Sequence, residues 1–113
     1  MSAWGPAAWE NDAAADWFGD MFDATGLAKY VEETLQRDVE DSHEEIRAAA
    51  HVLVTLGDTF MWPIDDLDND LSVAISKLQE IKALDIYREV PDFVKAIDEE
   101  IAILTSRFKQ RSD

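Results

Sequence analysis

The sequence predicts an all-α fold: a compact bundle of about five helices behind an irregular, tryptophan-containing lead-in, with residues 1–113 forming one domain. Apolar residues recur at spacings of three and four along nearly the whole chain, which is the period of one helix face. Only four glycines and three prolines interrupt the 113 residues. Alternation of apolar and polar residues, which would indicate strands, never lasts beyond a few positions. A chain of this length is typical of a single domain.

The first helix is expected over residues 12–25, after a lead-in that contains Trp4 and Trp9. Asn11 is a good N-cap, because its short side chain can accept a hydrogen bond from the first turn. Gly26 can take the left-handed conformation that ends a helix. The apolar stripe of this helix consists of Ala14, Trp17, Phe18 and Met21.

The second helix is predicted over residues 27–39, and the third has the clearest start signal in the chain. Ser42 with Glu45 three residues later forms a capping box. Residues 48–56 are apolar on most sides, which is typical of a central helix packed against several neighbours, and Gly57 ends it. The inward-facing residues of the second helix are expected to be Leu27, Tyr30, Val31, Leu35 and Val39.

Residues 58–66 are predicted to form a connection held against the core by its aromatic side chains. A fourth helix, capped by Asp66 or Asp68, is expected to follow, and after a short turn at residues 84–89 Pro91 suits the first position of a last helix. The inward residues of the fourth helix are Leu71, Ala74, Ile75, Leu78 and Ile81. Those of the last helix are Phe93, Val94, Ile97, Ile101, Leu104 and Phe108.

The composition excludes several classes of protein. The chain carries 10 basic and 25 acidic residues, a net charge of −15, and no cysteine. Without cysteine there is no disulfide scaffold, cysteine-ligated zinc or thiol catalysis. The surplus of carboxylates argues against direct nucleic-acid binding, which requires an excess of lysine and arginine. No apolar run approaches the ~20 residues of a membrane span, and the opening residues lack the pattern of a signal peptide. We therefore expect a cytoplasmic protein that binds neither nucleic acid nor membranes.

Two patterns resemble metal sites and fail. Glu40 and His43 have the Glu-x-x-His spacing of di-iron bundles, but such a site needs the motif twice, and Ala48 stands three residues before His51. The acids of residues 65–70 resemble the start of a calcium loop.

In that loop, counted from Asp66, Leu71 stands where glycine is needed and Lys77 stands where glutamate is needed. Helix capping explains these acids more simply. We expect no metal and no cofactor.

His43, Arg47 and His51 are spaced by four residues and so share one face of the third helix. These three residues could bind an anion or transfer protons, or they could simply form the solvent-exposed edge of an otherwise buried helix. Neither histidine has an obvious serine partner for acyl transfer. No catalytic residue is assigned, and the chain is not expected to be an enzyme.

The distribution of charge is the most informative feature. Residues 1–66 hold 15 acids and 3 bases, whereas residues 67–113 hold 10 and 7. Asp12, Asp16 and Asp20 stack at intervals of four, and like charges at that spacing cost a few tenths of a kcal/mol per pair. A basic partner would offset this cost. A solvated face that promotes solubility is the simpler explanation.

The opening of the chain carries a pattern of tryptophan, glycine and acidic residues. It reads Trp4-Gly5, then Trp9-Glu10-Asn11-Asp12, then Ala14, Asp16-Trp17 and Gly19-Asp20. This pattern resembles the opening of the bacterial domain of unknown function 4259 family. The departures are Ser2 where glycine is usual, Ala8 where proline is common, and Trp9 in place of phenylalanine.

The resemblance implies a small α-helical bacterial domain and brings no catalytic residues with it. The residues themselves indicate a structural motif, in which Asn11 caps the first helix while Trp4 and Trp9 clamp its entry and Trp17 packs in its stripe. The residues of this motif are Trp4, Gly5, Trp9, Asn11, Asp12, Ala14, Asp16 and Trp17.

The leading hypothesis is a non-enzymatic protein-binding module whose acidic face engages a basic partner, either as an immunity- or antidote-like protein or as a DNA mimic. One alternative is a small-ligand binder or enzyme with a polar pocket around His43 and His51. Another is a structural subunit that forms homo-oligomers. The acids expected to contact the partner are Asp12, Asp16, Asp20, Asp23, Glu32 and Glu33.

Overall fold

A computed structural model describes residues 5–112, and this part of the chain is all-α, with no strand. The helices are α1 (Asp12–Thr25), α2 (Leu27–Leu35), α3 (Val39–Leu56), α4 (Ile64–Ala83), α5 (Asp85–Arg88) and α6 (Pro91–Ser112). The all-α prediction is confirmed. The described chain has six helices rather than about five, because the expected turn at residues 84–89 closes a single helical turn, α5.

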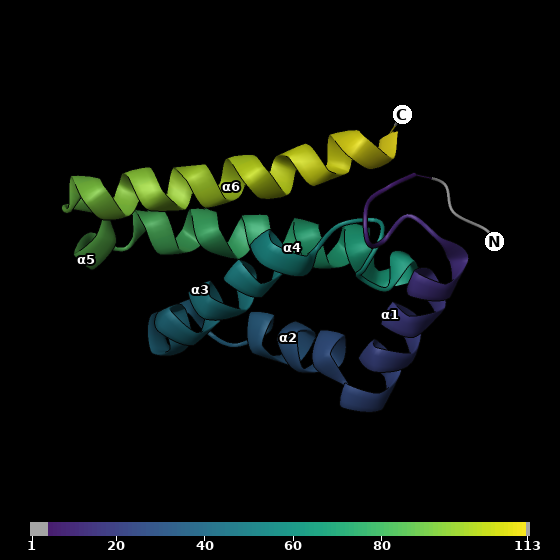
Figure 1. The fold of residues 1–113 in the computed structure, drawn as a ribbon. Helices are drawn as coiled ribbons and strands as arrows, with labels where there is room; N and C mark the ends of the chain where they lie inside the picture. The colour runs from purple at the N-terminus through teal and green to yellow at the C-terminus, as the bar shows by residue number, and fades with distance from the viewer. Residues whose placement is uncertain (1–4, 113) are drawn as a thin grey trace.

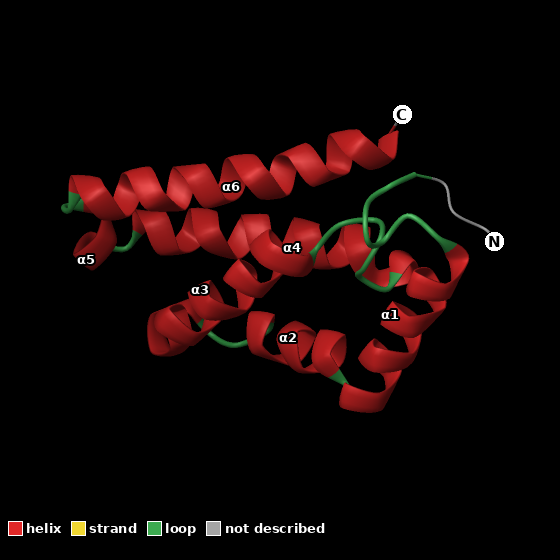
Figure 2. Ribbon diagram, viewed as in Figure 1, coloured by secondary structure: helices red, strands yellow, loops and turns green. Residues whose placement is uncertain are grey.

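The two longest helices, α4 and α6, lie side by side, and α5 reverses the chain between them (Figure 1). Helix α3 packs against both α4 and α6, and α2 packs against α3. Helix α1 stands crosswise at one end of the molecule, and Gly26 joins it directly to α2 (Figure 2). The arrangement is elongated, with principal extents of 53 × 26 × 20 Å.

One continuous apolar core joins these helices, and α3 and α4 supply most of it. The predicted stripe of α4 is confirmed, since all of it is fully buried except the half-buried Ile75. The prediction of a central third helix is confirmed as well. Its fully buried side chains are Ile46, Ala50 and Leu53.

Four predicted helix ends are confirmed. The Asn11 side chain accepts a hydrogen bond from the Ala14 backbone N–H at 2.8 Å. Gly26 ends α1 with a φ of 64°, in the left-handed region that favours glycine. Gly57 caps α3, and Pro91 opens α6.

The predicted boundary between the second and third helices was wrong. Helix α2 ends at Leu35, and Val39 belongs to the first turn of α3. The N-cap is Asp38, whose carboxylate accepts from the Asp41 N–H at 3.1 Å. Ser42, the predicted cap, lies inside α3 as a kink with φ −131° and ψ 28°. An aspartate four residues earlier therefore took the capping role.

The predicted caps of the fourth helix, Asp66 and Asp68, were also wrong. Helix α4 begins at Ile64, directly after Pro63, and no side chain caps it. Proline restricts the backbone before the helix, and the acids of the first turn lie where they favour the positive helix end.

Three aromatic residues predicted to face inward are exposed. Trp17 is 61% exposed, Tyr30 is 67% exposed, and Phe93 is also exposed. Helix α1 buries only Phe22, whose ring meets the Trp62 ring edge-on at 5.2 Å. Since that contact is the side of α1 that is covered, the side bearing Trp17 faces solvent.

Candidate functional site

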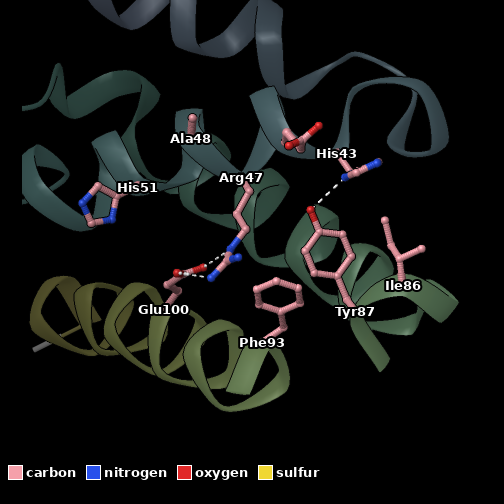
Figure 3. Close-up of a pocket in the computed structure, with 9 residues that line it drawn as sticks. His43, Arg47, Ala48, His51, Ile86, Tyr87, Phe93 and Glu100 are labelled. Carbon is pink, nitrogen blue, oxygen red and sulfur yellow. Dashed lines mark hydrogen bonds and ion pairs between the residues drawn. The ribbon is translucent and has the colours of Figure 1, made fainter. Parts of the chain in front are cut away.

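An open cleft of about 710 Å³ lies between α3 on one side and α5 and the start of α6 on the other (Figure 3). The predicted line of His43, Arg47 and His51 lies along its α3 side. The structure thus brings the three residues to one cleft, as their spacing predicts. The remaining lining residues are Glu44, Ala48, Ile86, Tyr87, Phe93 and Glu100.

Two polar pairs span the cleft, as the dashed lines of Figure 3 show. His43 Nδ1 lies 2.8 Å from the hydroxyl oxygen of Tyr87. The Arg47 guanidinium donates through Nε to Glu100 Oε1 at 3.2 Å and through Nη2 to Oε2 at 3.0 Å. The first pair joins α3 to α5 and the second joins α3 to α6, so together they fix the width of the cleft.

Burial raises the pKa of the Tyr87 phenol above its usual range. The nearby Arg47 acts in the opposite direction, and the carboxylates of Glu44 and Glu45 reinforce the rise. Tyr87 therefore keeps its proton at neutral pH. Its hydroxyl can donate that proton to Nδ1 of a neutral His43.

An apolar wall faces these polar pairs. Ile86 is 60% exposed and Phe93 is 42% exposed, although both are large and apolar. The Phe93 ring lies 5.3 Å from the buried Tyr87 ring, so two aromatic rings and one aliphatic chain line this wall. The cleft can therefore hold an apolar body beside a set of charged groups.

Sequence reasoning missed the half of the cleft that α5 and α6 supply. Tyr87 lies in the segment expected to be a turn, and Phe93 was assigned to the core. Glu100 meets a partner 53 positions away in the chain. No local spacing links these residues to α3, so only the folded arrangement reveals them.

The predicted partner-binding acids define the acidic surface, which lies on α1 and α2. Five of its six members are exposed, and Glu32 is half-buried. Asp16, Asp20 and Asp23 form no ion pair with any described residue. Lys29 is the single basic residue on these two helices. The members of the acidic surface are Asp12, Asp16, Asp20, Asp23, Glu32 and Glu33.

The structure describes all of the opening tryptophan- and glycine-containing motif except its first residue, Trp4, which lies outside the described residues. The Trp9 ring lies 6.0 Å from the Phe60 ring, and Asn11 caps α1 as predicted. Gly5 and Ala14 are half-buried, whereas Asp12 and Asp16 are exposed together with Trp17. The expected packing of Trp17 in the stripe of its helix was wrong, because this side chain touches Phe18 edge-on and otherwise faces outward.

A buried carboxyl group, Asp70, was not foreseen as part of the core. Its Oδ2 accepts from the indole Nε1–H of Trp62 at 2.8 Å, and the residue is 1% exposed. Burial raises its pKa to about 7; the Trp62 hydrogen bond opposes the rise, and the neighbouring Glu32 adds to it. Helix capping was expected to explain the acids of residues 65–70, but Asp70 instead holds Trp62 in place.

Within residues 5–112 no group of three or more acidic or histidine side chains is arranged to hold a metal ion. None of the described helices has an apolar stretch long enough to cross a membrane.

Comparison with known proteins returned nothing that matches this chain, whether among family models, curated proteins or solved structures. The resemblance of its opening to the domain of unknown function 4259 family therefore stays a prediction.

Proposed function

We propose that this is a non-enzymatic binding protein whose acidic surface engages a basic protein partner in the bacterial cytoplasm. The observation that carries the proposal is the exposure of Trp17 and Tyr30 on the same two helices as the acidic surface. Either feature alone has an ordinary explanation. Together they give α1 and α2 both exposed charge and exposed aromatic area.

The charge supplies attraction. Helices α1 and α2 carry six acids and one base, so their formal net charge is −5. Opposite charge on a partner speeds encounter at low salt and suppresses wrong partners. Within α1 the like charges repel one another, and a partner's lysine or arginine side chains would relieve that repulsion.

The aromatic residues supply anchors. Tryptophan, tyrosine and arginine are enriched among the residues that dominate protein–protein binding energy. Trp17 and Tyr30 leave large apolar areas in water that a partner could cover. Because α1 buries only Phe22, a partner could cover its outer side without disturbing the core.

Two kinds of partner fit this surface. An immunity- or antidote-like role would place it over a basic toxin, and a DNA-mimic role would place it in a nucleic-acid-binding groove. Both require a surface rich in lysine and arginine, so one experiment tests them together.

The test is affinity capture from the native cell's lysate with three forms of the protein at low and high salt. The first is the wild type, and the second is the triple variant Asp16→Asn, Asp20→Asn, Asp23→Asn. The third is a matched control with the same change in charge on exposed acids elsewhere, namely Glu80→Gln, Glu89→Gln, Glu99→Gln.

We expect the wild type and the control to retain a basic protein at low salt that the triple variant releases, and Trp17→Ala to weaken its retention. If the control variant released the partner equally, the effect would be one of net charge alone, and the proposal would be overturned. Retention of nothing by the wild type would also overturn it. The alternative, a structural subunit that forms homo-oligomers, is tested by sedimentation of the wild type and of Tyr30→Ala. If the protein self-associates through Tyr30, the variant should sediment more slowly.

A further inference from the structure

We propose that the cleft between α3, α5 and α6 binds a small organic cation, a primary amine or guanidine attached to an apolar body. This site is separate from the acidic surface, and the inference goes beyond the proposed function. It rests on the charges that remain in the cleft, on its apolar wall and on its size.

The charges of the cleft favour a cation. Arg47 is held by both oxygens of Glu100, so its charge is already balanced. With neutral histidines the remaining formal charge is that of Glu44, which lines the cleft and is exposed. An anion would meet this carboxylate in a protein of net charge −15, whereas a cation would be attracted by both.

The apolar wall provides a place for the body of the ligand. Ile86 and Phe93 are exposed there, although burying such large apolar side chains in the core would stabilise the fold. A cation near an aromatic face gains further attraction from the ring, and Phe93 and Tyr87 supply two rings 5.3 Å apart. Figure 3 shows the Phe93 ring between the Arg47–Glu100 pair and the Tyr87 ring. A volume of about 710 Å³ is within the range of small-molecule sites.

The arrangement suits binding rather than turnover. Nδ1 of His43 is engaged with the Tyr87 hydroxyl. That buried phenol is the one hydroxyl among the lining residues, and its pKa is raised, which weakens it as a nucleophile. The paired groups fix the shape of the cleft, and Glu44 is left to meet the cation.

The experiment compares three probes that share one ring and differ in the charge of the head group: benzylamine, benzyl alcohol and benzoate. Each is titrated into the ¹⁵N-labelled protein at pH 8 and constant ionic strength, and amide shifts are followed. We expect benzylamine, a cation at this pH, to give saturable shifts centred on Ile86, Tyr87 and Phe93. The alcohol and benzoate should bind roughly tenfold more weakly or not at all.

Two variants and a matched control locate the interaction. Glu44→Gln and Phe93→Ala should each weaken benzylamine binding roughly two- to fivefold. Glu45→Gln removes the same charge from the adjacent position, but Glu45 faces the groove between α2 and α3. It should weaken the affinity less than Glu44→Gln does, because its carboxylate acts on Tyr87 from outside the cleft. Amide spectra of each variant establish that the fold is retained.

Three outcomes would overturn the inference. Benzoate or benzyl alcohol binding as well as benzylamine would remove the preference for a cation. Equal weakening by Glu45→Gln would show that the general negative field, rather than the cleft, attracts the probe. Shifts that stay linear up to the solubility limit would show that no site exists.

Discussion

Helices α1 and α4 place their apolar residues in opposite ways. In α4 the predicted stripe is buried, and Leu71, Ala74, Leu78 and Ile81 have no exposed area. In α1 an equally regular stripe leaves Trp17 in solvent, and Phe22, outside the predicted stripe, is the residue that is buried. Helical spacing establishes which residues share a face. It does not establish whether another element covers that face, and this depends on where the chain places its neighbours.

The largest effect is expected when two alanine substitutions, one in each helix, are compared. Leu78→Ala should lower the free energy of unfolding by about 2–5 kcal/mol, because it opens a cavity in a fully buried site. Trp17→Ala removes a larger side chain, yet it should change stability by less than about 0.5 kcal/mol, since the residue is exposed. Urea denaturation of both variants measures the difference. A cost for Trp17→Ala near that of Leu78→Ala would mean that α1 is covered after all.

The core and the cleft differ in how much of each the sequence could predict. The apolar stripe of α4 and the two ends of α1, at Asn11 and Gly26, follow from local chemistry. A capping residue bonds to the backbone within one helical turn, so its role can be predicted from a short stretch of sequence. The start of α3 was wrong because Asp38 and Ser42 are both good caps, and local rules do not decide between them.

For the candidate site, the α3 side followed from spacing. The Tyr87 side did not, because contacts across 44 and 53 positions leave no mark in any short window.

The second test concerns Asp70, the carboxyl group that is buried in the core. Its pKa of about 7 in the folded protein lies above the ordinary 3.8, so the folded state holds a proton that the unfolded state has lost between those values. Stability should therefore fall as pH rises from about 4 to about 7 and then level off.

Asp70→Asn keeps an acceptor for the Trp62 indole N–H and cannot ionise. We expect it to stabilise the protein by up to about 4 kcal/mol at pH 8 and by only about 1–2 kcal/mol at pH 5, where the unfolded carboxyl group is already ionised but the folded one still holds its proton. Thermal melts at both pH values measure this. Glu32→Gln, which removes the neighbouring carboxylate, should flatten the same slope in part. A melting temperature that rose between pH 5 and pH 8 in the wild type, beyond the change in Asp70→Asn, would contradict the assignment.

A smaller effect is expected at the entry to α1. Asn11→Ala removes the acceptor for the Ala14 N–H and should cost about 0.5–2 kcal/mol. Asn11→Asp keeps an acceptor and serves as the control, so it should cost little. Denaturant midpoints measure both. Unchanged stability in Asn11→Ala together with the loss of partner binding would show a direct role in recognition.

The smallest effect concerns repulsion along α1. Asp16→Asn removes like-charge interactions with Asp12 and Asp20 and should stabilise the protein by a few tenths of a kcal/mol at low salt. The gain should disappear in 1 M salt, where charges are screened within about 3 Å. Paired melts at the two salt concentrations measure it. A gain that survived high salt would have a cause other than charge.

The way α1 is attached has a consequence for local opening. Gly26 alone separates α1 from α2, and the ring of Phe22 against Trp62 is its aromatic contact with the rest of the molecule. Amides of α1 should therefore exchange with deuterium sooner than those of α3 and α4, because this helix can detach while the core stays folded. A partner bound across α1 would close that route, so slowed exchange in this helix would report occupancy even where no shift in structure occurs.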